Sequence, residues 1–398
     1  MSSYSGSPAD LGRANRQRVV TVLQEQGPLS QADLARASGL SPATISAIVR
    51  ELEAEQRVER ESSRRGAPLR LLPLPGFVLG FDYGHRHLRV AVADRTGRLL
   101  GESAKSLPRD HDASTGVKAG LALAKKLLAE FDAGLGDVVA SGMGLPAPVL
   151  GESHLVGSSS ILPGWVGVHA DEQLADAIGH PVWVDNDANL GALAEMTWGA
   201  GRGARDLVYL KLATGIGAGI VVGGGIVRGA AGTAGEIGHT TMDEHGEVCR
   251  CGNRGCLETV AGADTVLRLL APVHGPDFRL QDAIDAARAG DAGCRRVIGD
   301  AGRHIGVALA NLINLLSPEL IVVGGELAGA GDVLLDPMRG AVGRFAIETA
   351  AQATTLALTA LGDRAEVLGA VALAVLSSDG APPACQSLDE DQPVASAG

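Results

Sequence analysis

Residues 234–258 read AGEIGHTTMDEHGEVCRCGNRGCLE and contain three of the five cysteines of the chain. The stretch supplies one imidazole and three thiols, on His239, Cys249, Cys251 and Cys256. A Cys₃His set is typical of structural zinc, because protein ligands fill all four positions and leave none for a catalytic water. Gly252 and Gly255 allow the loop to fold tightly enough for the sulfurs to converge. We predict a structural zinc site over residues 239–256; the alternatives are unmetallated buried thiols, or His245 as the nitrogen ligand.

Acidic and amide side chains accompany this motif. Glu236 precedes the histidine by three residues, and Glu258 follows the last cysteine by two. Further upstream, the strand-like run PVWV leads into DNDAN at residues 185–189 and then into the helical pattern LGALAEMTWGAG. Asn186 and Asp187 have two interpretations there, since they could cap this helix or join the glutamates in binding a polar ligand.

Composition limits the class of protein. The chain has 398 residues with 45% hydrophobic and 20% charged side chains, which favours two or three folding units and excludes wholesale disorder. Five cysteines are too few for a disulfide scaffold. Because the sequence contains no run of about 18 apolar residues and its first twenty residues lack the apolar core of a signal peptide, we expect a soluble cytoplasmic protein without a membrane partner.

The central part of the chain contains a repeated pattern. Residues 77–100, FVLGFDYGHRHLRVAVADRTGRLL, predict a strand, a glycine turn, a second strand, a turn and a third strand. Residues 206–229, DLVYLKLATGIGAGIVVGGGIVRG, show the same order. Helical segments follow each, at Val117 to Phe131 and at Arg303 to Leu316. The pattern predicts a duplicated α/β body of two lobes with a cleft between them.

The first 75 residues predict three helices and a hairpin. A helix over Arg13 to Gln26 stops at Gly-Pro, and Ser30 can cap a second. A third helix lies in SPATISAIVRELEAE, residues 41–55, with Ser41 as N-cap and Pro42 at the first helical position. Its buried stripe consists of Ile45, Ile48, Val49 and Leu52.

The opposite face of the third helix is small and polar, as in a recognition helix of a helix-turn-helix domain. We predict DNA contacts from this face and from the tip of the following hairpin, a wing formed by residues 57–61 and 69–72. The residues are Ser41, Thr44, Ser46, Arg50, Arg64 and Arg65. Residues 1–75 hold ten arginines against eight acidic residues, whereas the whole chain has a net charge of −12. The alternative is a three-helix bundle that docks on the body.

The motifs after this head resemble the ROK family of repressors, uncharacterised reading frames and sugar kinases. The resemblance spans residues 76–379, and residues 380–398 have the composition of a disordered tail, with Cys385 as a free thiol. It rests on LPGW (162–165), VDNDAN (184–189), TGIGAG (214–219), AGEIGH (234–239), CRCGNRGCLE (249–258) and LIVVGGEL (320–327). The resemblance implies an α/β body with the two-lobed, actin-like, hexokinase-type ATPase fold behind the winged helix-turn-helix domain.

The resemblance also implies residue roles. A sugar would be held by Asn186, Asp187, Glu236, His239 and Glu258, with Asp187 as the general base of any phosphotransfer. His239 would present its second ring nitrogen to the sugar while the zinc fixes its orientation. The phosphate loops would contain Asp82, Gly84, Thr214, Gly215 and Gly217.

The first phosphate loop departs from the family pattern, and this decides our functional interpretation. The family's kinases have Gly-Gly-Thr after an acidic residue, but here His85 and Arg86 replace the second glycine and the threonine. Asp82, a possible magnesium partner, is retained, so binding of ATP and Mg²⁺ stays open. We expect a sugar-responsive transcriptional repressor rather than an enzyme, acting on operator DNA as a homodimer or homotetramer, with a sugar or sugar phosphate as effector. The alternative is an ATP-dependent sugar kinase with an appended DNA-binding head.

Overall fold

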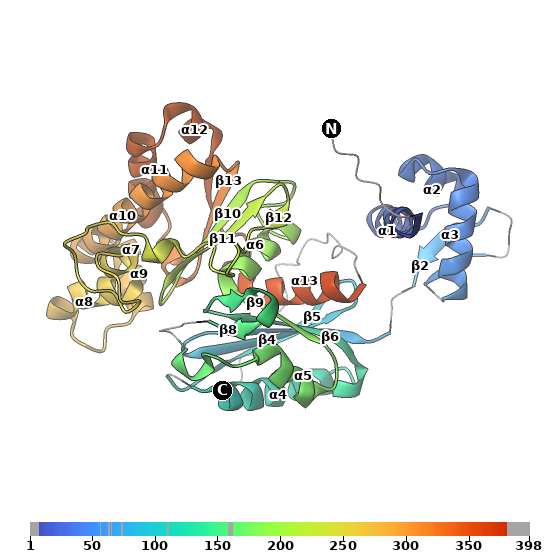
Figure 1. Ribbon diagram of the computed structural model, residues 1–398, viewed down its shortest axis with the longest axis horizontal. Helices are drawn as coiled ribbons and strands as arrows, with labels where there is room; N and C mark the ends of the chain where they lie inside the picture. Colours follow the sequence, from blue (N-terminus) through green and yellow to red (C-terminus); the bar gives the residue numbers. More distant parts are fainter. Residues whose placement is uncertain are drawn as a thin grey trace.

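The structure is a computed structural model, which describes residues 8–55, 57–62, 64, 66–72, 75–109, 111–157 and 162–379. Arg65, the tail residues 380–398 and Cys385 lie outside these residues. In Figure 1 the N-terminal head lies to one side of a two-lobed body, and a single segment of chain connects the two.

The head forms the three helices and the hairpin that the sequence predicts. Its elements are α1 (Pro8–Gln26), α2 (Gln31–Ser38), α3 (Pro42–Ala54), β1 (Val58–Arg60) and β2 (Leu69–Leu71). Ser30 Oγ accepts a hydrogen bond from the backbone N–H of Asp33, and Ser41 Oγ accepts one from Thr44, so both predicted caps are confirmed. Helix α1 begins at Pro8, before the expected Arg13. The sequence does not reveal this start, because the first turn has no apolar periodicity.

A separate hydrophobic core holds the head together. The predicted stripe of α3 is buried against α1 and α2; the fully buried residues include Val19, Leu34, Ile45, Val49 and Leu52. The β1–β2 hairpin is antiparallel, and an isolated bridge joins Leu29 to Leu69. An ion pair between Arg16 and Glu55 fastens α1 to the end of α3. These contacts fix the orientation of α3 relative to the hairpin.

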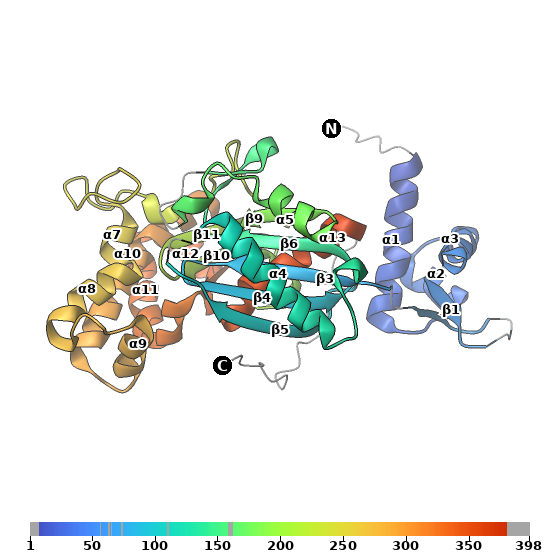
Figure 2. The same cartoon turned by 90° about the horizontal axis from the view of Figure 1, so that it is seen from below.

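The first lobe of the body is built on a five-stranded sheet with the order β5-β4-β3-β6-β9. Strands β3 (Phe77–Tyr83), β4 (His87–Asp94) and β5 (Leu99–Ser106) are antiparallel, whereas β6 (Val138–Leu145) and β9 (Val182–Asn186) continue the sheet in parallel. Helices α4 (Ala113–Ala129) and α5 (Ala170–Ile178) lie on one face of the sheet (Figure 2). A small hairpin joins β7 (Val149–Leu150) to β8 (Leu155–Val156).

The second lobe repeats this topology, with the order β12-β11-β10-β13-β14. Its strands are β10 (Leu207–Leu212), β11 (Ile216–Val222), β12 (Gly225–Ile226), β13 (Leu320–Gly324) and β14 (Thr355–Leu358). Again the first three are antiparallel and the last two are parallel to the first. The predicted duplication of an α/β unit is therefore confirmed.

Additional helices belong to the second lobe. They are α7 (Leu257–Ala261), α8 (Ala263–His274), α9 (Leu280–Arg288), α10 (Ala292–Leu316), α11 (Asp332–Phe345) and α12 (Glu348–Ala353). Helix α10 starts well before the expected Arg303, because Asp291 caps it by accepting a hydrogen bond from the backbone N–H of Cys294.

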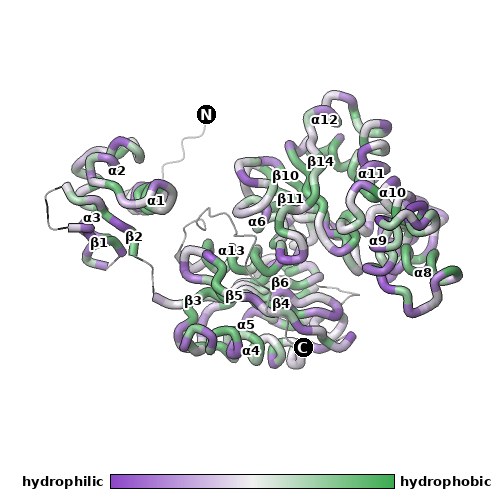
Figure 3. The backbone as a smooth tube through the Cα atoms, turned by 180° about the vertical axis from the view of Figure 1, so that it is seen from behind, coloured by the Kyte–Doolittle hydropathy of each residue, from purple (hydrophilic) through white to green (hydrophobic). Residues whose placement is uncertain are grey.

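Two helices, α6 (Asp187–Thr197) and α13 (Ala365–Asp379), cross between the sheets (Figure 1). One hydrophobic core includes Val78 of the first sheet, Tyr209 of the second and Val371 of α13, so the helices join the lobes. In Figure 3 the backbone tube of α13 is largely coloured hydrophobic, as this burial requires. Glycine permits the close approach, because a Cβ on Gly369 would lie 1.9 Å from the carbonyl oxygen of Leu190.

Among the described residues, no helix combines the length and the apolar character that a membrane span needs.

The contact between α6 and α13 leads to a stability prediction. Gly369→Ala should lower the melting temperature in calorimetry by several degrees, because overpacking costs about 1–3 kcal/mol and must displace a backbone carbonyl. Gly343→Ala is the control, since a Cβ there meets nothing within 4 Å and alanine is the better helix former. Equal melting temperatures of the two variants would contradict the close crossing.

Candidate functional site

The cysteine loop folds through backbone hydrogen bonds and two glycines in left-handed conformation. The backbone N–H of Cys249 donates to Asn253 at 2.7 Å, and that of Gly252 donates to Cys249 at 2.9 Å. The φ angles of Gly252 and Gly255 are 91° and 63°, values that side chains with a Cβ rarely adopt. The two glycines thus do what the sequence predicts, and the loop turns back on itself.

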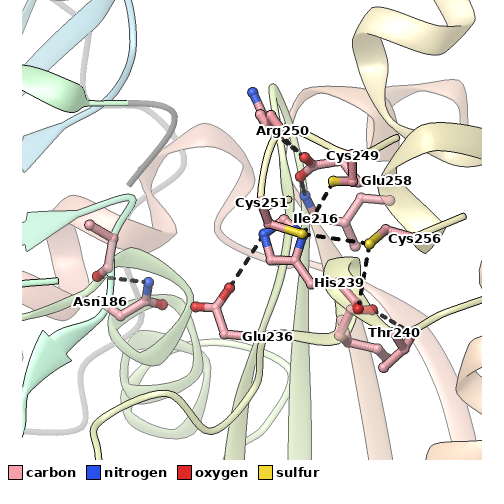
Figure 4. A network of polar contacts seen from close by, with 12 residues as sticks. Asn186, Ile216, Glu236, His239, Thr240, Cys249, Arg250, Cys251, Cys256 and Glu258 are labelled. Carbon is pink, nitrogen blue, oxygen red and sulfur yellow. Dashed lines mark hydrogen bonds and ion pairs between the residues drawn. The ribbon is translucent and has the colours of Figure 1, made fainter. Parts of the chain in front are cut away.

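This folding brings the four predicted ligands together. The donor atoms of His239, Cys249, Cys251 and Cys256 all lie within 4.8 Å of one another. The sulfurs of Cys251 and Cys256 are 3.7 Å apart, and Nδ1 of His239 lies 3.7 Å from Sγ of Cys249 (Figure 4). A tetrahedron with zinc–sulfur bonds of about 2.3 Å has edges close to this length, whereas a disulfide needs about 2.05 Å. The donor set therefore fits zinc.

His245, the alternative nitrogen ligand, lies elsewhere. Its side chain is 88% exposed, and its Nε2 lies 3.6 Å from Glu244. Among the described residues, the group of donors around the three cysteines contains His239 and not His245. The geometry thus favours the first of the two nitrogen ligands considered from the sequence.

The second ring nitrogen of His239 faces away from the sulfurs. Its Nε2 lies 3.8 Å from Oε2 of Glu236, as the close view shows (Figure 4). Burial, together with the charges of Asp187 and Glu258, raises the pKa of Glu236 to about 7. The imidazole therefore has one nitrogen toward the cysteines and one toward a carboxyl group, which is the orientation expected for contact with a polar ligand.

Glu258 connects the cysteine loop to the start of strand β11. Its Oε2 accepts a hydrogen bond from the backbone N–H of Ile216 at 3.1 Å, and its Oε1 accepts one from Nε of Arg250 at 2.7 Å. Arg250, between two of the cysteines, was not singled out from the sequence. Both oxygens of Glu258 thus have protein partners. A ligand hydroxyl would share Oε1 with Arg250 or displace Arg250 from it.

Asn186 and Asp187 lie where β9 ends and α6 begins. Asn186 is the N-cap, since its Oδ1 accepts from the backbone N–H of Ala188 at 2.9 Å, and its Nδ2 donates to the carbonyl of Ala147 at 3.2 Å. Oδ1 of Asp187 also accepts from Ala188, at 2.8 Å. The capping interpretation of Asn186 is therefore correct, although capping does not prevent ligand contacts from its remaining hydrogen-bonding capacity.

Asp187 also forms a buried ion pair that the sequence analysis did not anticipate. Nζ of Lys211 on β10 lies 2.8 Å from Oδ2 of Asp187 and 3.4 Å from Oε1 of Glu366 on α13. Tyr209 donates a hydrogen bond to the same glutamate oxygen at 3.0 Å. The signal was a single lysine within the apolar strand run LVYLKLA, which calls for a buried acidic partner.

The first predicted phosphate loop is occupied by an imidazole. The ring of His87 lies directly over Gly84, where a Cβ would come within 2.0 Å of it, and its Nε2 lies 3.0 Å from Oδ2 of Asp82. Burial lowers the pKa of His87, but the charge of Asp82, the hydrogen bond to it and the charge of Glu366 together raise it overall. His85 and Arg86, at the turn itself, precede the ring. Sequence reasoning noted these two residues but missed His87.

The second predicted phosphate loop lies between β10 and β11. It contains Thr214 and Gly215. Gly217 follows on β11, where an added Cβ would lie 3.5 Å from the Cβ of Ala188 on α6. Arg250 lies near the carbonyl of Thr214, at 3.5 Å. The cysteine loop, the second glycine loop and the start of α6 therefore meet at one place in the body.

Four of the predicted DNA-contacting residues, Ser41, Thr44, Ser46 and Arg50, lie on α3 or at its N-cap. Arg50 is exposed, and its Nε lies 3.3 Å from the carbonyl of Ser46 one turn earlier. The hydroxyls of Ser41 and Thr44 lie 2.8 Å apart at the start of α3. Arg64 is exposed on the segment between β1 and β2.

Comparisons with known proteins agree with this division into head and body. Residues 78–376 match the profile of the ROK family, and residues 13–59 match that of winged helix-turn-helix DNA-binding domains. A xylose repressor of Caldicellulosiruptor bescii is 27% identical over 389 residues, covering 93% of this chain and 97% of its own length. A glucokinase of Halalkalibacterium halodurans is 33% identical, covering 73% of this chain and 92% of its own.

A solved structure extends the comparison to the fold. The crystal structure of a ROK family transcriptional regulator, described as a homologue of the E. coli MLC protein, superimposes with a TM-score of 0.77 at 27% identity. It covers 91% of this chain and 95% of its own. The likeness to the regulator structure covers 91% of the chain, which is more than the body alone, whereas the likeness to the glucokinase covers 73%.

The convergence of the four donor atoms predicts the outcome of a ligand exchange. Cys251→Ser should lower zinc affinity at least tenfold, because it removes one of four thiolate or imidazole donors. His245→Ala should leave zinc content unchanged, since that side chain is exposed and outside the group. Zinc per chain, measured by elemental analysis after dialysis against a chelator, checks both. Loss of zinc in His245→Ala with retention in Cys251→Ser would reverse the assignment.

Proposed function

The chain belongs to the ROK family and carries a winged helix-turn-helix head, and from this premise we propose that it is a sugar-responsive transcriptional regulator, acting as a repressor. The observation that carries the proposal is the joining of a complete head, with its own core, to a body whose polar residues gather around the cysteine loop. The similarity to the xylose repressor named above covers 93% of this chain and 97% of that protein.

The head supplies the proposed DNA-binding surface. Helix α3 would enter the major groove, with Ser41 and Thr44 near phosphates at its N-terminus and Ser46 and Arg50 along its side. Arg64 and Arg65 of the hairpin would approach the backbone or the minor groove. The exposure of Arg50 supports this proposal, as does the buried core that holds α3 against α1 and α2.

The body supplies the proposed effector site. A sugar would be held by hydrogen bonds to Asn186, Asp187, Glu236, His239 and Glu258. Zinc bound to His239 and the three cysteines would fix the ring of His239. Its Nε2 would then point toward the sugar beside Glu236. When bound, zinc supplies structure to this loop and no reactive position. Rigid, partly charged acceptors are suited to recognise hydroxyl groups.

The site residues come from both lobes, which provides a route from sugar to DNA. Asn186 and Asp187 lie at the end of the first sheet, whereas Glu236, His239 and Glu258 follow strands of the second. Arg228, after β12, donates two hydrogen bonds to Asp185 at 2.9 and 2.6 Å and so already connects the two. A sugar that contacts both groups would favour one arrangement of the lobes and, in a homodimer, one spacing of the heads.

The second candidate function is that of an ATP-dependent sugar kinase with an appended head. The identity to the glucokinase and the intact glycine loop after β10 favour it. Against it stand His87 over Gly84, and the ion pair that Asp187 would have to loosen to act as a general base. We therefore propose that ATP is not turned over efficiently. We also propose that the head comprises residues 1–75, the sensor residues 76–379 and a tail residues 380–398.

Two measurements separate the candidates. A thermal-shift panel of hexoses, pentoses, amino sugars and their phosphates identifies the effector, because a bound ligand raises apparent stability by mass action. A coupled assay with that sugar then measures ATP consumption. A shift without turnover supports a sensor, whereas sugar-dependent turnover at ordinary kinase rates of about 1–100 s⁻¹ would establish the kinase.

The surface of α3 leads to a mutational prediction. Arg50→Ala should weaken binding to the operator about tenfold, because a lost arginine contact to a base or phosphate costs about 1–3 kcal/mol. Sugar affinity should not change, since Arg50 lies in the head. Arg303→Ala is the control, a surface arginine of α10 paired with Asp300. Fluorescence anisotropy of a labelled duplex checks the result, and equal affinity of both variants would remove Arg50 from the interface.

A further inference from the structure

Two buried carboxylates pair with Lys211 where the lobes and the crossing helices meet, and the charge of a third raises the pKa of the same lysine. Asp82 on β3, Asp187 at the start of α6 and Glu366 at the start of α13 are 2%, 6% and 4% exposed. Carboxylates from separate elements, withdrawn from water, need a compensating cation, because isolated buried charges are very unfavourable. Asp and Glu oxygens are also the ligands that Mg²⁺ and other hard divalent ions prefer.

In this protein the cation is an amino group of the chain. Nζ of Lys211 lies 2.8 Å from Asp187 and 3.4 Å from Glu366, and its side chain is 11% exposed. Burial by itself lowers the pKa of Lys211, but the charges of Asp187, Glu366 and Asp82 outweigh burial and raise it. The side chain is therefore an ammonium ion at neutral pH, hydrogen-bonded to Asp187 and ion-paired with Glu366.

The third carboxylate is engaged only in part. Oδ2 of Asp82 faces Nε2 of His87 at 3.0 Å, whereas Oδ1 is buried and has no hydrogen-bond partner within the described ranges. The charges of His87 and Lys211 both lower the pKa of Asp82, against burial, which raises it. The group thus offers the oxygen ligands of a metal site, while its positive charge comes from Lys211 and Oδ2 of Asp82 faces His87.

A divalent ion and this ammonium exclude each other. A metal ion must lie about 2.0–2.6 Å from its carboxylate oxygens, and Nζ already lies 2.8 Å from the Asp187 oxygen that would ligate it. Two positive centres this close repel strongly in a medium of low dielectric constant. Lysine must therefore move away or lose its proton before a metal can enter.

We propose that Lys211 is a built-in cation that takes the place of a divalent metal ion between Asp82, Asp187 and Glu366. Lys211 then compensates part of the carboxylate charge at the junction of the lobes without Mg²⁺, so that the body can take up a sugar without a metal–nucleotide complex. This inference rests on the proposed sensor function, but it concerns metal binding alone and is tested without sugar or DNA.

The test is a titration of the zinc-loaded full-length protein with Mn²⁺, in which electron paramagnetic resonance measures the free ion. The wild-type protein should bind no Mn²⁺ at this group. Lys211→Met removes the charge at similar length and should bind one Mn²⁺ per chain, at least tenfold more tightly than wild type. Lys118→Met, at an exposed position of α4, is the matched control and should behave as wild type.

Further variants make each outcome decisive. Asp82→Asn added to Lys211→Met should abolish the gained Mn²⁺ site, and Lys211→Gln provides a second neutral side chain if the methionine variant does not fold. The proposal is overturned if a folded neutral variant with full zinc content gains no Mn²⁺. It is also overturned if the wild-type protein binds one Mn²⁺ that Asp82→Asn removes, a result that requires only wild-type folding. Neither outcome would bear on operator binding.

Discussion

The ammonium of Lys211 between the carboxylates of Asp187 and Glu366 is the interaction on which the body depends. These carboxylates lie at the first turns of α6 and α13, the two helices that cross between the sheets. Carboxylates are favourable at helix N-termini, but burial there would be costly without a positive charge. Because one lysine of β10 pairs with both, it fixes the second sheet to the helices, and the helices in turn position Asn186 beside the site.

The same architecture serves proteins with different chemistry, so the side chains at the lobe junction decide the function. In this chain the first glycine turn is covered by His87, the proposed base is paired with a lysine, and the cysteine loop orients His239 toward Glu236. Each of these features suits a body that recognises a polar ligand and holds it. The winged helix-turn-helix head adds a DNA-binding domain to this body.

The sequence predicted much of this arrangement, because the relevant signals were local. Serine caps, a proline at the first helical position and an apolar stripe defined the head, and the spacing of cysteines and glycines predicted the cluster with His239. The repeated strand and glycine pattern predicted the duplication. The early start of α1 was missed because its first turn carries no apolar periodicity, whereas that of α10 is set by the Asp291 cap, which the sequence analysis did not use.

The missing part of the site depends on contacts between residues far apart in the chain. Lys211 and Glu366 are separated by most of the second lobe, and Arg250 reaches Glu258 only because the cysteine loop folds back. His87 covers Gly84 through a turn whose side-chain direction no spacing rule gives. Such pairs are set by tertiary packing, so a lysine in an apolar strand signals a partner without naming it.

The sugar response is tested most directly by the affinity of the zinc-loaded protein for a DNA duplex that the protein selects from a random library. The affinity is measured with and without the sugar that stabilises the protein, in the absence of Mg²⁺ and ATP. This sugar alone should change the dissociation constant at least tenfold. An affinity that stays constant until a metal–nucleotide complex is supplied and consumed would contradict this expectation.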